Sequence, residues 1–175
     1  MDYAIIPECY IDTNLIETLL PPQRQYNHQK GCGTVTKVMQ ERFTDRFALG
    51  IIDKDKQEVK YLNEFTEVCQ SDSLILYKHR TRHHYMIRIS PAMERFIMAN
   101  AVAAGIALTD FDLPSDFELL KRESKKINSK NDQRFKRLFR SLYQNGAPGI
   151  LKLASWVKYL KDSNYHVDLA AFKVM

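Results

Sequence analysis

The chain has 175 residues, of which 45% are hydrophobic and 27% are charged, and it carries a formal net charge of +5. This length and balance indicate a soluble globular protein of one domain with a sizeable core. No run of 18 apolar residues exists to span a membrane, and residues 1–7 lack the regions of a signal peptide, so we expect a cytoplasmic protein without membrane association. The three cysteines, Cys9, Cys32 and Cys69, are scattered, which argues against a disulfide framework and a structural zinc site.

The first part of the chain predicts short strands that alternate with helices. Residues 3–7 form an apolar run that stops at Glu8, as a first strand would. Asn14 and Glu17 have the spacing of a capping box and predict a helix that ends before two prolines. A short second strand is expected around residues 26–28.

The central strand is predicted at residues 47–55, after a turn at residues 31–34 that leads into a second helix. The run is apolar for six residues, which is too short for a helix, and it stops at Asp53 and Asp55. The connections between these strands are too long for hairpins. We therefore expect an α/β fold with a mostly parallel central sheet flanked by helices, Rossmann-like in its layers.

Two further strands are predicted at residues 73–78 and 84–89. His79, His83 and His84 stand among basic residues between them. These side chains could contact phosphates or a metal, but a solvated hairpin loop is the favoured interpretation.

The rest of the chain is predicted to be helical. Ser90 is a candidate N-cap, and the proline after it opens a helix that runs to about Ala104. A final amphipathic helix is expected over residues 150–161. We predict an α/β core over residues 1–110 and a helical C-terminal extension over residues 111–175, packed on the same domain.

Positive charge is concentrated in residues 121–140, where nine Lys or Arg face only Glu123 and Asp132. A basic segment on a nearly neutral body is typical of proteins that bind a polyanion, commonly nucleic acid. The alternative is a solvated helix face. The cations expected to bind nucleic acid are Lys121, Arg122, Lys125, Lys126, Lys130, Arg134, Lys136, Arg137 and Arg140.

Three acids are predicted to meet at one edge of the sheet. Glu8 follows the first strand, and Asp53 and Asp55 end the central one, so parallel strands would bring them together. Carboxylate oxygens suit Mg²⁺ or Mn²⁺, which phosphodiester chemistry uses to neutralise phosphoryl charge and activate a nucleophile. Glu8 is also a candidate general base. Asp12 would not bind the metal itself but would orient the acids that do.

Each of these residues has a simpler interpretation. The two aspartates could belong to a polar turn, Glu8 could be an ordinary surface acid, and Asp12 is favoured as a helix N-cap. Backbone N–H groups at Gly31, Gly33 and Thr34 could bind a phosphate at the start of the second helix, although glycines also begin helices for conformational reasons alone.

The order of these features resembles the Toprim domain of topoisomerases, DnaG-type primases, recombination proteins and overcoming-lysogenization-defect nucleases. The resemblance covers residues 3–90, and the chain as a whole is similar to a stand-alone bacterial Toprim-like protein. It implies a mostly parallel α/β domain in which the glutamate and the Asp-x-Asp pair gather Mg²⁺ for phosphodiester chemistry. One departure is Cys9, which stands where the family usually has a glycine after the glutamate.

These observations lead to three hypotheses. The first is a metal-dependent nuclease-like protein that acts on nucleic acid through Glu8, Asp53 and Asp55. The second is a non-catalytic module that keeps the fold and binds nucleic acid or a protein. The third is a protein that binds only another protein, in which the basic segment is a solvated helix. Whether the chain associates with itself is left open.

Overall fold

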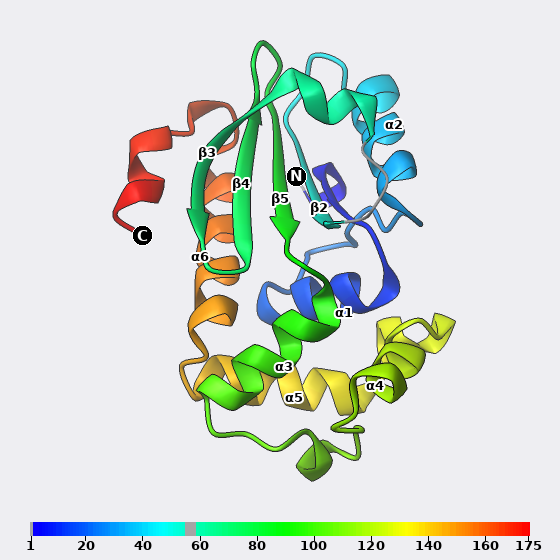
Figure 1. Cartoon of the computed structure of the whole chain (residues 1–175). Helices are drawn as coiled ribbons and strands as arrows, with labels where there is room; N and C mark the ends of the chain where they lie inside the picture. The colour runs from blue at the N-terminus through cyan, green and yellow to red at the C-terminus, as the bar shows by residue number, and fades with distance from the viewer. Residues whose placement is uncertain (1, 55–58) are drawn as a thin grey trace.

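A mixed five-stranded sheet forms the centre of the computed structural model, which describes residues 2–54 and 59–175 (Figure 1). The strand order is β1-β2-β5-β4-β3. β1, β2 and β5 are parallel to one another, whereas β4 is antiparallel to both β5 and β3. The bounds are β1 (Ile5–Pro7), β2 (Ala48–Asp53), β3 (Phe65–Ser71), β4 (Leu74–His79) and β5 (His84–Ile89).

The prediction of an α/β fold is confirmed, but the prediction of a mostly parallel sheet is wrong. Short turns join β3 to β4 and β4 to β5, and such turns can connect only antiparallel strands. β3 itself was missed. It is an edge strand whose side chains at Thr66, Glu67 and Gln70 are exposed, so its sequence looks like a charged loop.

Helices cover the sheet and make up most of the second half of the chain (Figure 1). None of the helices in residues 2–54 and 59–175 has the length and apolar character needed to cross a membrane. The α-helices are α1 (Tyr10–Leu19), α2 (Cys32–Arg42), α3 (Met93–Ala103), α4 (Phe117–Ser124), α5 (Gln133–Gln144) and α6 (Pro148–Ser163). The 3₁₀ helices are η1 (Asp2–Ala4), η2 (Lys60–Glu64), η3 (Leu108–Phe111), η4 (Ile127–Asn131), η5 (Asn164–His166) and η6 (Leu169–Lys173).

The core surrounds β2, whose residues are buried from Ala48 to Ile52 because the strand lies between two parallel neighbours and beneath α2. Gly50 allows a close approach here. A Cβ atom at this position would lie 2.5 Å from the Met86 sulfur on β5 and 3.1 Å from the Met39 sulfur on α2. The central strand was therefore predicted correctly, and its glycine serves packing.

The N-cap of the first helix lies five residues before Asn14, the N-cap of the predicted capping box. Cys9 is the N-cap of α1, and its Sγ accepts a hydrogen bond from the Asp12 backbone amide at 3.5 Å. Asn14 is buried inside the helix instead, and its Nδ2 donates to the Ser129 carbonyl at 2.7 Å. This bond ties α1 to the helical C-terminal part, where α1 also packs against α5.

Residues 26–29 follow the outer edge of β1 without forming a strand. Asn27 N donates to Ile5 O and Gln29 N donates to Pro7 O, both at 3.0 Å. The predicted short strand is thus an irregular segment that satisfies the edge of the sheet.

Candidate functional site

An acidic pocket lies where the parallel strands end and helices α1 and α3 begin, at the lower end of the sheet in Figure 1. Its volume is about 720 Å³. Glu8 follows β1, Asp53 is the last residue of β2, and Glu94 lies in the first turn of α3. Three separate elements therefore deliver carboxylates to one pocket, as the ends of parallel strands commonly do.

Glu8 and Asp53 are in direct contact. Glu8 Oε2 accepts a hydrogen bond from the Asp53 backbone amide at 3.0 Å, and the Glu8 amide donates to the Ile51 carbonyl at 3.0 Å. The structure thus brings together two of the three predicted acids. The third, Asp55, lies outside the described residues.

Asp12 is buried beside these acids, at the third position of α1 rather than at its N-cap. Its Oδ2 accepts from the Cys9 amide at 3.2 Å, which completes a capping box. Burial raises the pKa of Asp12 to about 7, and the negative charges of Glu8 and Glu94 act in the same direction. Within the described part of the chain, Asp12 Oδ1 is buried without a hydrogen-bond partner.

Asp53 shows the same effect more strongly. Burial raises its pKa to about 9, helped by the charges of Asp12, Glu8 and Glu94 and opposed by a hydrogen bond from the Met93 backbone amide. Its Oδ1 is also buried without a partner among residues 2–54 and 59–175. Burial is therefore the main cause of both raised pKa values, and repulsion between the carboxylates adds to it.

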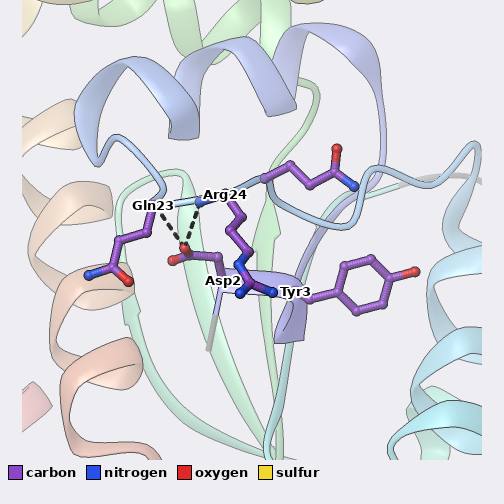
Figure 2. A pocket seen from close by; sticks show the side chains of 5 residues that line it. Asp2, Tyr3, Gln23 and Arg24 are labelled. Atoms are coloured by element: carbon purple, nitrogen blue, oxygen red, sulfur yellow. Dashed lines mark hydrogen bonds between the residues drawn. The ribbon is translucent and has the colours of Figure 1, made fainter.

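Asp2 provides a contrast within the same chain. Its carboxylate accepts from the Gln23 amide at 2.8 Å and the Arg24 amide at 3.4 Å, as Figure 2 shows, and it pairs with Lys161 Nζ at 2.5 Å. Burial alone would raise the pKa of Asp2, but the hydrogen bonds and the charge of Lys161 lower it. Asp53 lacks a cation of this kind among the dominant influences on its pKa.

The chemistry of these acids fits a hard divalent cation, because carboxylate oxygens are the donors that Mg²⁺ and Mn²⁺ prefer. The Oδ1 atoms of Asp12 and Asp53, which have no hydrogen-bond partner in the described residues, could serve as ligands to a cation. In the described ranges, however, no three His, Cys, Asp or Glu side chains are grouped closely enough to hold a metal ion. Magnesium commonly uses only one or two protein carboxylates and fills its other positions with water and phosphate oxygens.

Basic side chains surround the acids. Lys30, Lys54, Lys121 and Lys125 line the pocket, so an anionic ligand would meet positive charge at its edge and carboxylates at its floor. Lys121 and Lys125 were predicted from the basic segment. Lys30 and Lys54 were not, because nothing in their local sequence distinguishes them from other surface lysines.

His28 also lines the pocket, although no local sequence pattern pointed to it. Its ring stacks on Tyr10 at a centroid distance of 4.4 Å, and its Nδ1 lies 2.9 Å from Thr13 Oγ1. The Thr13 hydroxyl donates to the Cys9 carbonyl at 2.7 Å, so His28 Nδ1 must be the donor in their contact. Burial lowers the pKa of His28 and favours the neutral ring, which leaves Nε2 able to accept a proton.

Glu94 and Ser124 close the pocket from the helical side. Glu94 is buried, and its Oε1 accepts a hydrogen bond from Ser124 Oγ of α4. An acid at a helix start is common for reasons of helix stability alone, and Ser124 lies 30 positions away. The sequence therefore offered no signal that these two side chains would meet.

Of the predicted phosphate-binding residues, Gly31 lines the pocket as the N-cap of α2. Gly33 and Thr34 lie exposed in the first turn of that helix. Gly31 has a φ of +88°, a conformation that favours glycine whatever the function. Phosphate binding at these residues stays a prediction.

Acids neutralise much of the basic segment. Arg134 pairs with Glu123 at 2.8 Å and with Asp132 at 2.7 Å. The other ion pairs are Lys126 with Glu123, Lys121 with Glu118, Lys130 with Glu17, and Arg137 with Asp112. Glu118, Glu17 and Asp112 lie outside residues 121–140, so a count of the charges within the segment could not reveal them.

The prediction of a solvated histidine loop is wrong for two of its three members. His79 and His84 are buried, and only His83 is exposed. His84 Nδ1 accepts from the Tyr61 hydroxyl at 2.6 Å, and its Nε2 donates to the Phe43 carbonyl at 2.8 Å. These two bonds define a neutral histidine that joins β5 to its neighbours.

Comparisons of the chain with family models, with curated proteins and with solved structures found no match. The functional argument therefore rests on the geometry of the pocket, and the resemblance to Toprim domains stays a hypothesis.

Proposed function

We propose that the acidic pocket binds Mg²⁺ or Mn²⁺ and carries out phosphodiester chemistry on nucleic acid, as a nuclease-like enzyme. The observation that supports this most is the pair of buried, mutually repelling carboxylates at Asp12 and Asp53, each with an unpartnered oxygen atom in the described structure. Repulsion of this kind costs stability, and a divalent cation would remove the cost.

In this proposal Asp53 and Glu8 hold the cation, and Asp55 is the third expected ligand. A bound divalent cation supplies charge neutralisation at the phosphoryl group and lowers the pKa of a water molecule. Asp12 holds its neighbours in place through the start of α1, where it bonds the Cys9 amide. The lysines around the pocket position the phosphate by charge.

His28 is the base that the geometry supports best. Its Nδ1–H is fixed by Thr13, which sets the tautomer and leaves Nε2 with a lone pair. A neutral imidazole near neutral pH can take a proton from an attacking water, whereas Glu8 is already engaged with the Asp53 amide. We therefore assign the general base to His28 and metal binding to Glu8.

The alternative function is a non-catalytic module that binds nucleic acid or a protein through the same fold. Cys9 favours it, because its side chain caps α1 directly after Glu8 and limits how closely a phosphate could approach the backbone there.

Cleavage assays with purified variants separate the two functions. Labelled single-stranded DNA, duplex DNA and RNA would be incubated with wild-type protein, Asp53→Asn and His28→Gln, in Mg²⁺, Mn²⁺ or EDTA. We expect cleavage by wild-type protein that EDTA abolishes and that each variant reduces at least 100-fold, while Glu67→Gln, an exposed acid on β3, stays active. A wild-type protein that turns over none of these substrates in either metal would overturn the enzymatic proposal.

A further inference from the structure

A second pocket, which we call the arginine pocket, lies toward the other end of the sheet, where β2 begins. Its volume is about 700 Å³. It is formed by η1, the end of α2, the loop that leads into β2, and η5. Its lining includes Tyr3, Arg42, Arg46 and Tyr165, and also Glu41, whose carboxylate pairs with Lys37 at 3.9 Å.

The two arginines contact neutral groups. Arg42 Nη1 donates to the Tyr3 hydroxyl at 3.3 Å. Arg46 lies over the Phe43 ring at 5.2 Å and donates to the Arg42 carbonyl. Each guanidinium carries five N–H donors, so both exposed side chains keep donors for a ligand. Two of the four arginines of the basic segment differ, because Arg134 and Arg137 are paired with carboxylates.

Two exposed tyrosine rings accompany these arginines. Tyr3 is 47% exposed and Tyr165 is 44% exposed, so part of each ring is accessible to a ligand beside the arginines. Tyr165 is also held in place, because its hydroxyl accepts from the Phe47 amide at 3.2 Å and the His83 ring packs edge-on against it at 5.0 Å. A ring fixed in this way can stack on a ligand at little entropic cost.

We propose that the arginine pocket binds single-stranded nucleic acid without sequence preference. Arg42 and Arg46 would contact successive phosphates, and Tyr3 and Tyr165 would stack on bases. Proteins that hold single strands combine cationic side chains with aromatic faces in this way. Acidic peptides would use the arginines but gain little from the exposed rings. This surface is separate from the acidic pocket, and its binding requires no metal.

The test measures binding in EDTA, so that cleavage at the acidic pocket plays no part. Fluorescence anisotropy with a labelled 12-nucleotide thymidine or uridine strand would be recorded at 50 mM and 200 mM NaCl. We expect Arg42→Gln/Arg46→Gln to weaken binding about tenfold at low salt and to reduce the slope of log K against log salt by about 1.4, as two lost phosphate contacts predict. Tyr165→Leu should weaken binding about tenfold, whereas Tyr165→Phe, which keeps the ring but loses the hydrogen bond from the Phe47 amide, should weaken it much less.

Two comparison variants make the result specific. Lys158→Gln/Lys173→Gln removes two exposed charges elsewhere and should leave binding within about twofold of wild type. Lys136→Gln/Arg140→Gln tests the basic segment as the competing surface. The proposal is overturned if the wild-type protein binds no strand at 50 mM NaCl, or if the basic-segment variant loses as much affinity as the arginine-pocket variant. It is also overturned if a poly-glutamate peptide competes with the strand equally well in wild type and Tyr165→Leu, because the Tyr165 ring would then add nothing to binding of the strand.

Discussion

Replacing Asp53 with asparagine should stabilise the protein in the absence of divalent cations, because asparagine keeps the shape of the side chain but cannot ionise, in the pocket or in the unfolded chain. Folding raises the pKa of Asp53 to about 9, against about 3.9 in an unfolded chain. The native state therefore retains a proton that the unfolded chain releases, and stability falls as the pH rises from about 4 to about 9.

The size of the effect follows from this difference. Each pH unit between the two pKa values costs about 1.4 kcal/mol, so the upper limit at pH 8 is roughly 5 kcal/mol and at pH 5 roughly 1.5 kcal/mol. Asp12 shares the repulsion, and neighbouring side chains can relax. We therefore expect Asp53→Asn to be more stable than wild type by on the order of 2 kcal/mol at pH 8 and by much less at pH 5.

Urea unfolding in EDTA, followed through the fluorescence of buried Trp156, measures this gain at both pH values. Asp2→Asn is the matched control. Folding lowers the pKa of Asp2, so that variant should be less stable than wild type at pH 8, which is the opposite sign. Saturating Mn²⁺, at about 100 times its Kd, should add about 2.7 kcal/mol to wild type and nothing to Asp53→Asn. A destabilised Asp53→Asn at pH 8, or a gain that does not change with pH, would refute the reasoning.

Two further predictions concern the core. Burial lowers the pKa of His84 to about 4, so the stability it contributes is complete above about pH 6.5 and is lost as the pH falls toward 4. The difference in unfolding free energy between wild type and His84→Gln should therefore shrink by about 2 kcal/mol from pH 7 to pH 4, and an unchanged difference would contradict a neutral His84. Gly50→Ala should cost about 1–3 kcal/mol in urea unfolding because its Cβ would crowd Met86, whereas Gly33→Ala, with open space around its Cβ, should cost nothing.

The sequence predicted those parts of the fold and site that depend on local pattern. The apolar run of β2 and its terminal aspartate identified both a buried strand and the edge where Asp53 meets Glu8. Cys9 is a rare N-cap, so the start of α1 was placed too late. β3 was missed because one edge strand with polar exposed positions has no distinctive pattern. The first error comes from an uncommon local cap, and the second from a strand that only tertiary pairing with β4 defines.

The partners that decide the chemistry are set by contacts between distant parts of the chain. His28 becomes a candidate base only through Thr13, which lies 15 residues earlier, on another element. Glu94 joins the pocket only because β5 delivers α3 to the same edge as β2. Neither residue has a local motif. A single sequence therefore indicates a cluster of acids more readily than it indicates what surrounds them.

Charge counts and charge environments lead to different conclusions about binding surfaces in this protein. Residues 121–140 hold the largest local excess of positive charge, but carboxylates on α1, on α4 and near η3 neutralise several of those side chains. Arg42 and Arg46 are inconspicuous in the sequence, yet they contact neutral groups beside two exposed rings. A ligand gains most from charges that the protein has not already paired, since forming a new contact with a paired side chain requires breaking an existing one.

The acidic pocket follows the same rule with the opposite sign, because its carboxylates repel one another and a cation would gain from all of them. We therefore expect polyanions and cations to bind at the unpaired groups, which the net charge of +5 does not locate.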